Sequence, residues 1–294
     1  MITHVLAGLF RQGTTIVWFI TKRSNPDKLH LYEPCHPELF DRLKNWEKGK
    51  IDEMHRLPLW DDYLDIPNEF MTLMMKKHPY KNAIIRFEEV KPYLNVINEI
   101  PSKIVIQPCR LNFVLKDIKL CYNCVTIAIL RNPVDTYLSH FDANVLRDEE
   151  KVMKFSLKET DGDPFFTNEI YRELAEIYDF PMNANNLEQF AVVWTLANYN
   201  AIIGADYVIV YERLCLNPYN YLRYLNNTIE GLDYDIIYGD LINPYRAFKL
   251  VHYRNVILKE IESTVSDYGL DRFYDRVMEE GDYYEVFERT MERY

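Results

Sequence analysis

The sequence predicts one α/β domain, a three-layer sandwich in which helices cover both faces of a central, mainly parallel five-stranded sheet. Short runs of β-branched residues alternate with longer stretches of helical period, which is typical of a parallel sheet with helical connections. A chain of 294 residues, 48% of them hydrophobic, can bury one large core, and no long polar tract divides it. We therefore expect a single domain over residues 1–294.

The expected elements follow one another along the chain with two interruptions. Strands are predicted at 3–6, 29–32, 103–107, 125–130 and 207–211, and helices at about 14–22, 133–145, 168–178, 187–203 and 255–268. Residues 40–100 and 143–186 fit the alternation poorly. Because loops beyond the carboxyl ends of the strands carry specificity in α/β folds, we interpret both segments as insertions or lids beside the binding site.

Composition limits the partners and surroundings that we expect. A net charge of -11 argues against general binding to nucleic-acid backbones, so an anionic ligand needs a local site. Five cysteines without the spacing of a disulfide framework favour a reducing, cytoplasmic compartment. The first residues do not resemble a signal peptide, and no apolar run approaches the ~20 residues that cross a membrane. We expect neither nucleic acid nor membrane as a partner.

A glycine-bounded loop follows the first expected strand and leads directly into an apolar helical stretch. The loop reads Gly8-Leu-Phe-Arg-Gln-Gly13-Thr14-Thr15. Backbone N–H groups at such a loop and helix start bind anions, and glycines permit close approach. The spacing is near the P-loop pattern, but Thr14 replaces the lysine that contacts the β and γ phosphates. Arg11 supplies a positive charge instead. A plain strand, turn and capped helix is the structural alternative.

A second arginine ends the strand expected at 125–130. The segment from Arg131 to Ser139 reads RNPVDTYLS, and Pro133 suits the first turn of a helix. An arginine at the carboxyl end of a strand and a serine about two helical turns later can hold one phosphate from two sides. The sequence therefore predicts a second anion site.

Together, the R-x-G-T-T loop and the R-x-P-x-x-x-x-x-S segment resemble the PAPS-dependent sulfotransferases. The resemblance implies a P-loop-like nucleotide-hydrolase fold and transfer of a sulfuryl group from PAPS, with the 3′,5′-bisphosphate PAP as product. It implies a 5′ phosphosulfate site made of Arg11, Gln12, Gly13, Thr14 and Thr15, and a 3′ phosphate site made of Arg131 and Ser139.

Further segments in the same order extend the resemblance to about residue 218. They are Gln107-Pro-Cys-Arg110-Leu111, the pair Trp194 and Asn198, and Val208-Ile-Val-Tyr211-Glu212-Arg-Leu214. By resemblance Tyr211 contacts the adenine, although a buried strand end followed by a helix cap also explains it. Serine and lysine are usual in the family at Gln12 and Gln107, which leaves open a non-catalytic protein that binds PAP.

Sulfuryl transfer needs in-line placement, cations for the leaving phosphate and a base for the acceptor proton. Arg11 is the expected stabiliser of the leaving group, assisted by Arg110, and no metal is expected. The resemblance implies Glu33, at the end of the second strand, as the base. A solvated Glu33 is the alternative, and His140 is the reserve base. His36 is close in sequence to Glu33, but a lone histidine is more often a surface or satisfied core residue.

The acceptor, a hydroxyl or amine of a small molecule, carbohydrate or protein, is not identified by any pattern. An ATP-dependent P-loop kinase is the competing enzyme class, and the missing lysine argues against it. Cys121 and Cys124 have the spacing of half a zinc site, but no second pair accompanies them.

Overall fold

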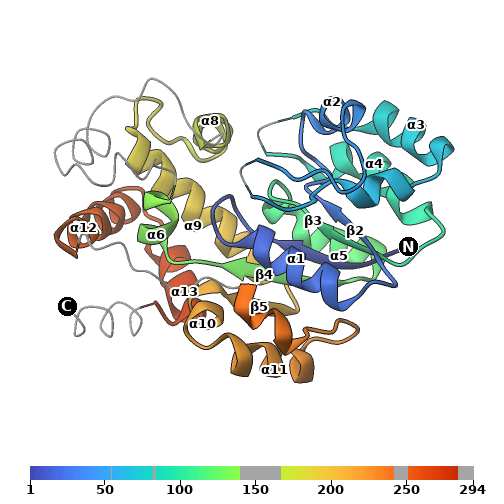
Figure 1. Cartoon of the computed structure of the whole chain (residues 1–294). Helices are drawn as coiled ribbons and strands as arrows, with labels where there is room; N and C mark the ends of the chain where they lie inside the picture. Colours follow the sequence, from blue (N-terminus) through green and yellow to red (C-terminus); the bar gives the residue numbers. More distant parts are fainter. Residues whose placement is uncertain (54, 82–83, 140–166, 242–250, 284–294) are drawn as a thin grey trace.

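The computed structural model describes residues 1–53, 55–81, 84–139, 167–241 and 251–283 (Figure 1). All five strands are parallel and form one sheet in the order β2-β3-β1-β4-β5. The strands are β1 (Ile2–Ala7), β2 (Leu29–Tyr32), β3 (Ile104–Gln107), β4 (Val125–Leu130) and β5 (Tyr207–Val210). The prediction of an α/β fold with a five-stranded parallel sheet is confirmed.

Helices cover both faces of this sheet. The connection from β1 to β2 runs across the sheet in the opposite direction to the connections that follow β2, β3 and β4. Right-handed crossovers therefore place α1 (Thr14–Ser24) on one face, and α4 (Phe87–Glu99), α5 (Leu115–Tyr122) and α9 (Asn186–Gly204) on the other. Figure 1 shows α1 in front of the sheet, and α5 and α9 pack against β4 from behind.

Burial explains why these segments form central elements. Residues Ile104–Ile106 of β3 and Ile127–Leu130 of β4 are completely buried, as expected for strands covered on both faces. Helix α9 is apolar around most of its circumference, since it packs on the sheet, α5, α8 (Thr167–Tyr178) and α13 (Asp271–Gly281). Its start is fixed by a capping box between Asn185 and Glu188.

Most predicted helices are found near their predicted bounds: α1, α8, α9 and α12 (Val251–Asp267). The helix predicted at 133–145 is the exception, because α6 (Pro133–Leu138) ends at Leu138 and Ser139 forms its C-cap. Residues 140–145 lie outside the described residues. Tyr211 begins α10 (Tyr211–Leu216) instead of ending β5.

The segment 40–100, expected to be an insertion, is largely helical. It contains α2, which begins at Leu39, and then η1, α3 and α4. The bounds of the elements without a predicted counterpart are α2 (Leu39–Lys44), η1 (Asp61–Asp65), α3 (Asn68–Lys77), η2 (Asn112–Val114), α11 (Pro218–Thr228) and η3 (Ile236–Leu241), besides α4, α5, α10 and α13. Of the other expected insertion, 143–186, residues 143–166 are not described, and α8 packs on α9.

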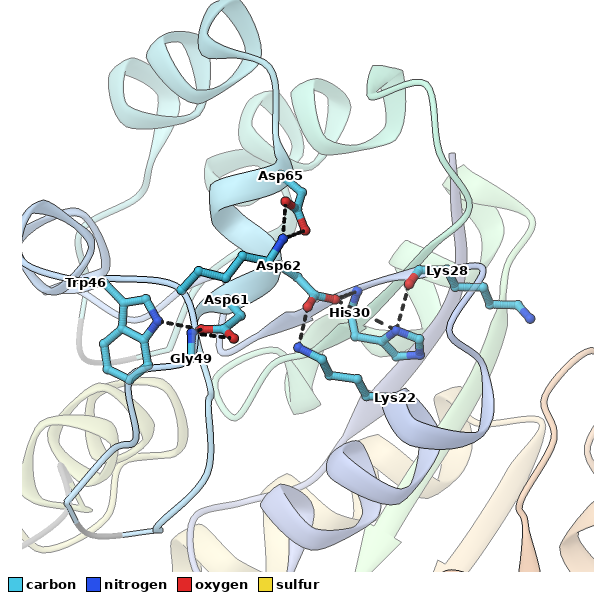
Figure 2. A network of polar contacts seen from close by, with 9 residues as sticks. Lys22, Lys28, His30, Trp46, Gly49, Asp61, Asp62 and Asp65 are labelled. Atoms are coloured by element: carbon cyan, nitrogen blue, oxygen red, sulfur yellow. Dashed lines mark hydrogen bonds and ion pairs between the residues drawn. The ribbon is translucent and has the colours of Figure 1, made fainter.

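Carboxylates of η1 fasten the insertion to the sheet (Figure 2). Asp62 is ion-paired with Lys22 of α1 and accepts a hydrogen bond of 2.6 Å from the backbone N–H of His30 in β2. Asp61 accepts from the indole N–H of Trp46 at 2.9 Å and from the backbone N–H of Gly49. Asp62 therefore holds η1 against β2, and Asp61 holds the chain that follows α2 against η1.

Within the described ranges, no helix has both the length and the hydrophobicity needed to cross a bilayer.

Candidate functional site

A cavity of about 260 Å³ lies at the carboxyl ends of β1, β2 and β3. The helix after β1 packs on one face of the sheet, while the helices after its neighbours β3 and β4 pack on the other. Crevices at such positions are where α/β proteins bind ligands. The three residues predicted to be catalytic, Arg11, Glu33 and Arg110, all line this cavity, together with Thr14 and Thr15.

The loop after β1 has the backbone geometry of an anion cradle. Arg11 and Gly13 both adopt left-handed conformations, with φ of 66° and 81°. A non-glycine residue rarely adopts this conformation, so the loop holds Arg11 in a strained turn. Gly13 is the N-cap of α1 and has no side chain to cap the first-turn N–H groups. These donors and the positive end of the helix dipole are suited to an anion.

The side chain of Gln12 supports this loop from the protein core. It is completely buried, accepts a hydrogen bond of 2.8 Å from the backbone N–H of Leu9, and donates one of 3.0 Å to the Oδ1 of Asn198. Gln12 is absent from the cavity wall. Its amide therefore positions the loop against α9, whereas the sequence predicted a contact with the donor.

Arg131 joins the end of β4 to the same loop. Its Nη1 donates a hydrogen bond of 2.8 Å to the carbonyl oxygen of Arg11, and its guanidinium lies 5.1 Å from the ring centroid of Tyr211. The Tyr211 ring in turn packs on Gly13, where a Cβ atom would overlap it. The two segments predicted to bind the two anionic ends of the donor thus meet directly. Ser139, at the end of α6, donates its hydroxyl to the carbonyl of Thr136 at 2.8 Å.

One turn of α9 contacts both segments. The indole N–H of Trp194 donates to the carbonyl oxygen of Arg131 at 3.2 Å, and Asn198, one turn later, accepts from Gln12. The Asn198 amide also donates to the carbonyl oxygen of Trp194 at 2.9 Å. The sequence marked both residues only as family matches. Their spacing of four residues places them on one side of the helix, which is the signal for a shared role.

A buried polar network behind Arg131 was not predicted. The backbone N–H and the Nδ2 of Asn132 donate to Glu212 Oε1 at 2.9 and 2.6 Å, and Asn132 Nδ2 also donates to Asp135 at 2.7 Å. Asp135 is ion-paired with Arg254 of α12. Burial raises the pKa of Glu212 to about 7. The network fixes the start of α6 and with it the backbone of Arg131.

Glu33 lies among polar groups at the ends of β2 and β3. Its φ is 41°, and its backbone N–H donates to the carbonyl oxygen of Gln107 at 2.8 Å. The Sγ of Cys109 lies 3.4 Å from Glu33 Oε1, and Nη1 of Arg110 lies 3.5 Å from Oε2. Burial is the main cause that raises the pKa of Cys109, so its thiol stays protonated and can donate. The Arg110 guanidinium also lies 4.9 Å from the ring centroid of Phe10.

Burial and neighbouring charges lower the pKa values of two basic groups in the cavity, Arg11 and His36. Burial, and then the nearby Arg131, lower the pKa of Arg11. Burial, followed by the charges of Arg110 and Arg42, lowers the pKa of His36 to about 3, so this ring is neutral near pH 7. His140, the histidine predicted as the reserve base, lies outside the described residues. The cavity therefore combines arginines, the carboxylates of Glu33 and Asp52, and the imidazoles of His36 and His55. The described part of the chain contains no group of three or more side chains arranged to hold a metal ion.

Comparison with known proteins gives little further information. No protein-family model matches the chain, and no solved structure matches it significantly. The chain is 28% identical over 277 residues to an "Uncharacterized protein" of Archaeoglobus fulgidus. The matched region covers 83% of this chain and 88% of that protein. The similarity therefore concerns most of both chains and brings no activity with it.

Proposed function

We propose that this protein is a PAPS-dependent sulfotransferase with a P-loop-like α/β scaffold, which transfers a sulfuryl group to a hydroxyl or amine. The observation that carries the proposal is the hydrogen bond of 2.8 Å from Arg131 to the carbonyl oxygen of Arg11. PAPS has a phosphosulfate at one end and a 3′ phosphate at the other, so it needs two neighbouring anion sites. The contact supports such an arrangement because it joins the two segments that the resemblance assigns to them.

Residues of both segments support this assignment of the donor. The loop after β1 offers the first-turn N–H groups of α1 and the cationic side chain of Arg11, which lines the cavity. The end of β4 offers Arg131, which is not among the residues that line the cavity but contacts the backbone of Arg11. The strand order, with β1 and its loop in the centre of the sheet, agrees with a P-loop-like scaffold. Thr14, which occupies the place of the P-loop lysine, is buried with its hydroxyl 3.8 Å from Cys109 Sγ. This arrangement disfavours an ATP-dependent kinase.

The reaction follows from the groups that share the cavity. The acceptor oxygen or nitrogen attacks the sulfur, the bond from sulfur to the bridging phosphate oxygen breaks, and its electron pair leaves with PAP. Arg11 stabilises the charge on the leaving phosphate, with Arg110 nearby. A base in the cavity removes the acceptor proton, and Glu33 is the base that the resemblance implies. The hydroxyl groups of Tyr32 and Thr15 are hydrogen-bonded to each other at 2.9 Å, which holds the Tyr32 hydroxyl next to the loop after β1.

Calorimetry with PAP and AMP tests the donor assignment. We expect PAP to bind at least tenfold more tightly than AMP, since only PAP carries the 3′ phosphate, and the Arg131→Ala variant to lose this difference. Arg223→Ala is the matched control, because Arg223 is an exposed arginine of α11 far along the chain from both segments. Equal affinity of the wild-type protein for PAP and AMP contradicts the proposal.

A non-catalytic PAP-binding protein is the second candidate. It is favoured by the structural use of Gln12 and Gln107, which stand where serine and lysine are usual in the family. Gln12 supports the loop, and Gln107 donates to Cys109 at 3.2 Å. Radiolabelled PAPS, incubated with a panel of phenols, alcohols, amines and oligosaccharides, separates the two candidates. PAP binding without label transfer to any acceptor favours the second.

A further inference from the structure

A carboxylate and a histidine from the insertion form one wall of the cavity. Asp52 and His55 both line it, as does Trp60. Asp52 Oδ1 lies 2.8 Å from the Nδ1 of His55 and accepts a second hydrogen bond of 2.8 Å from the backbone N–H of the same residue. Because a carboxylate only accepts, Nδ1 carries the proton in this contact, and in the neutral form of the ring Nε2 presents a lone pair.

Backbone hydrogen bonds within the segment stabilise the turn that carries Asp52 and His55. The N–H of Asp52 donates to the carbonyl oxygen of Leu57 at 3.0 Å, and the N–H of Arg56 donates to the carbonyl oxygen of Asp52 at 2.8 Å. The His55 ring packs at 6.1 Å, edge to face, on the ring of Tyr32. The pair therefore has a defined orientation, in which the two hydrogen bonds accepted by Asp52 Oδ1 fix the histidine.

The position of the pair relates it to the transfer site. Tyr32 separates the His55 ring from the first turn of α1, since its hydroxyl is hydrogen-bonded to Thr15. The side chain of His55 is 28% exposed. Across the part of the chain that the structure describes, no hydrogen bond involves its Nε2, so this nitrogen is accessible to a ligand in the cavity.

The other candidate bases of the cavity are less suited to this role. Both carboxylate oxygens of Glu33 are contacted, one by Cys109 and the other by Arg110. His36 has its pKa lowered to about 3 by burial and neighbouring arginines, which makes its neutral ring a weak base. Of these groups, only His55 combines an accessible nitrogen with a carboxylate that fixes the ring from the other side.

We propose that His55 is the base of the transfer reaction and that Asp52 is its positioning residue. This inference rests on the proposed function, and it assigns to His55 the role of general base that the resemblance implies for Glu33. Nε2 of His55 takes the proton of the acceptor hydroxyl or amine as the acceptor atom bonds to sulfur. The electron pair of the broken sulfur–oxygen bond leaves on the phosphate of PAP, and the imidazolium later releases its proton to water.

The test compares single and double variants of the full chain. Label transfer from radiolabelled PAPS to the acceptor panel is measured with PAP affinity. We expect His55→Gln to lower kcat by about 100- to 10,000-fold, the usual contribution of a general base, at unchanged PAP affinity. Added imidazole restores part of the activity of His55→Ala. Glu53→Gln, a neighbouring exposed carboxylate, is the control for Asp52→Asn.

The double variant shows whether Asp52 acts through His55. We expect Asp52→Asn alone to lower kcat and the Asp52→Asn/His55→Gln protein to be no slower than His55→Gln, because residues that act as a unit are not additive. A merely structural role predicts additive losses and no rescue by imidazole.

Each remaining outcome identifies what has failed. Wild-type transfer rates in His55→Gln overturn the inference and leave the proposed function intact. Loss of PAP affinity in His55→Gln, with no rescue by imidazole, makes His55 part of the donor site or the fold and also overturns it. Wild-type protein that does not bind PAP overturns the proposed function and the inference together. PAP binding by the wild-type protein without any label transfer means that the protein is not a sulfotransferase, so the assignment of His55 as its base is overturned as well.

Discussion

Gly13 offers the sharpest test of how the loop and Tyr211 pack together. Gly13 and Gly49 have nearly the same φ, 81° and 84°, in the left-handed region. A Cβ atom at Gly13 would overlap the ring of Tyr211, whereas nothing lies within 4 Å of a Cβ atom at Gly49. The Gly49→Ala variant therefore measures the cost of the left-handed conformation alone, and Gly13→Ala adds the displacement of the ring.

The magnitudes separate the two contributions. An alanine in a left-handed conformation costs about 1 to 2 kcal/mol, and the reduced entropy of the unfolded chain offsets a similar part at both positions. Forcing extra atoms into a packed site typically costs about 1 to 3 kcal/mol more. We therefore expect the free energy of unfolding to fall by about 1 to 3 kcal/mol further in Gly13→Ala than in Gly49→Ala.

Urea unfolding of both variants, each with and without Tyr211→Ala, measures this difference. Because Tyr211→Ala removes the ring, the excess cost at Gly13 should disappear in that background while the cost at Gly49 stays. PAP affinity should fall in Gly13→Ala only, since the displaced ring lies against Arg131. Equal losses at Gly13 and Gly49 with Tyr211 intact would refute the packing argument.

Three further predictions concern buried or anchoring groups. Gln12→Ala should lower the free energy of unfolding in urea by about 2 to 5 kcal/mol, because a cavity forms and the N–H of Leu9 loses its buried partner; a change below 1 kcal/mol contradicts this role. The carboxyl of Glu212 holds its proton more tightly in the folded than in the unfolded chain, with a pKa raised from 4.5 to about 7. Its contribution therefore falls as pH rises through that window, by up to about 1.4 kcal/mol per pH unit, and the slope should flatten in Glu212→Gln when urea unfolding is repeated from pH 5 to 8. Asp62→Ala should speed proteolysis between residues 45 and 60, since Lys22 and the N–H of His30 lose their shared partner; an unchanged cleavage rate argues against the anchoring role.

The strands could be predicted because their signal is local. The segment 125–130 is a run of β-branched and apolar residues, and 29–32 is a short, mainly apolar run between Lys28 and Glu33; both are found with the predicted bounds. The insertion gave no such signal. Helix α3 buries only Met74 completely and Phe70 and Met71 partly, so its apolar stripe is short, and α4 contains Pro92 in its interior, a residue that ordinarily argues against a helix.

The site, like the fold, could be predicted only where its residues lie in a local sequence pattern. Arg11 and Arg131 follow from the loop and the strand end in which they occur, and the structure brings them together. The partners that hold them are distant in sequence: 186 residues separate Gln12 from Asn198, and 80 separate Asn132 from Glu212. Whether such residues meet depends on the order of the strands in the sheet, and a local sequence pattern does not reveal that order. Asp52 and His55 are close in sequence, but only the fold places them on the cavity wall.

The two halves of the site are built by different parts of the chain and meet at Arg11. Its carbonyl oxygen accepts from Arg131, on the half formed by β4, β5 and α9, while the residue also lines the cavity formed with β2, β3 and the insertion. If the protein is a sulfotransferase, the first half binds the donor and the second receives the acceptor. Changes behind Arg131, as in the Glu212 network, should then act on PAP affinity, whereas changes in the insertion, as at His55, should act on the rate and choice of acceptor. Variants that alter both equally would mean that the cavity beside Arg11 belongs to the donor site alone.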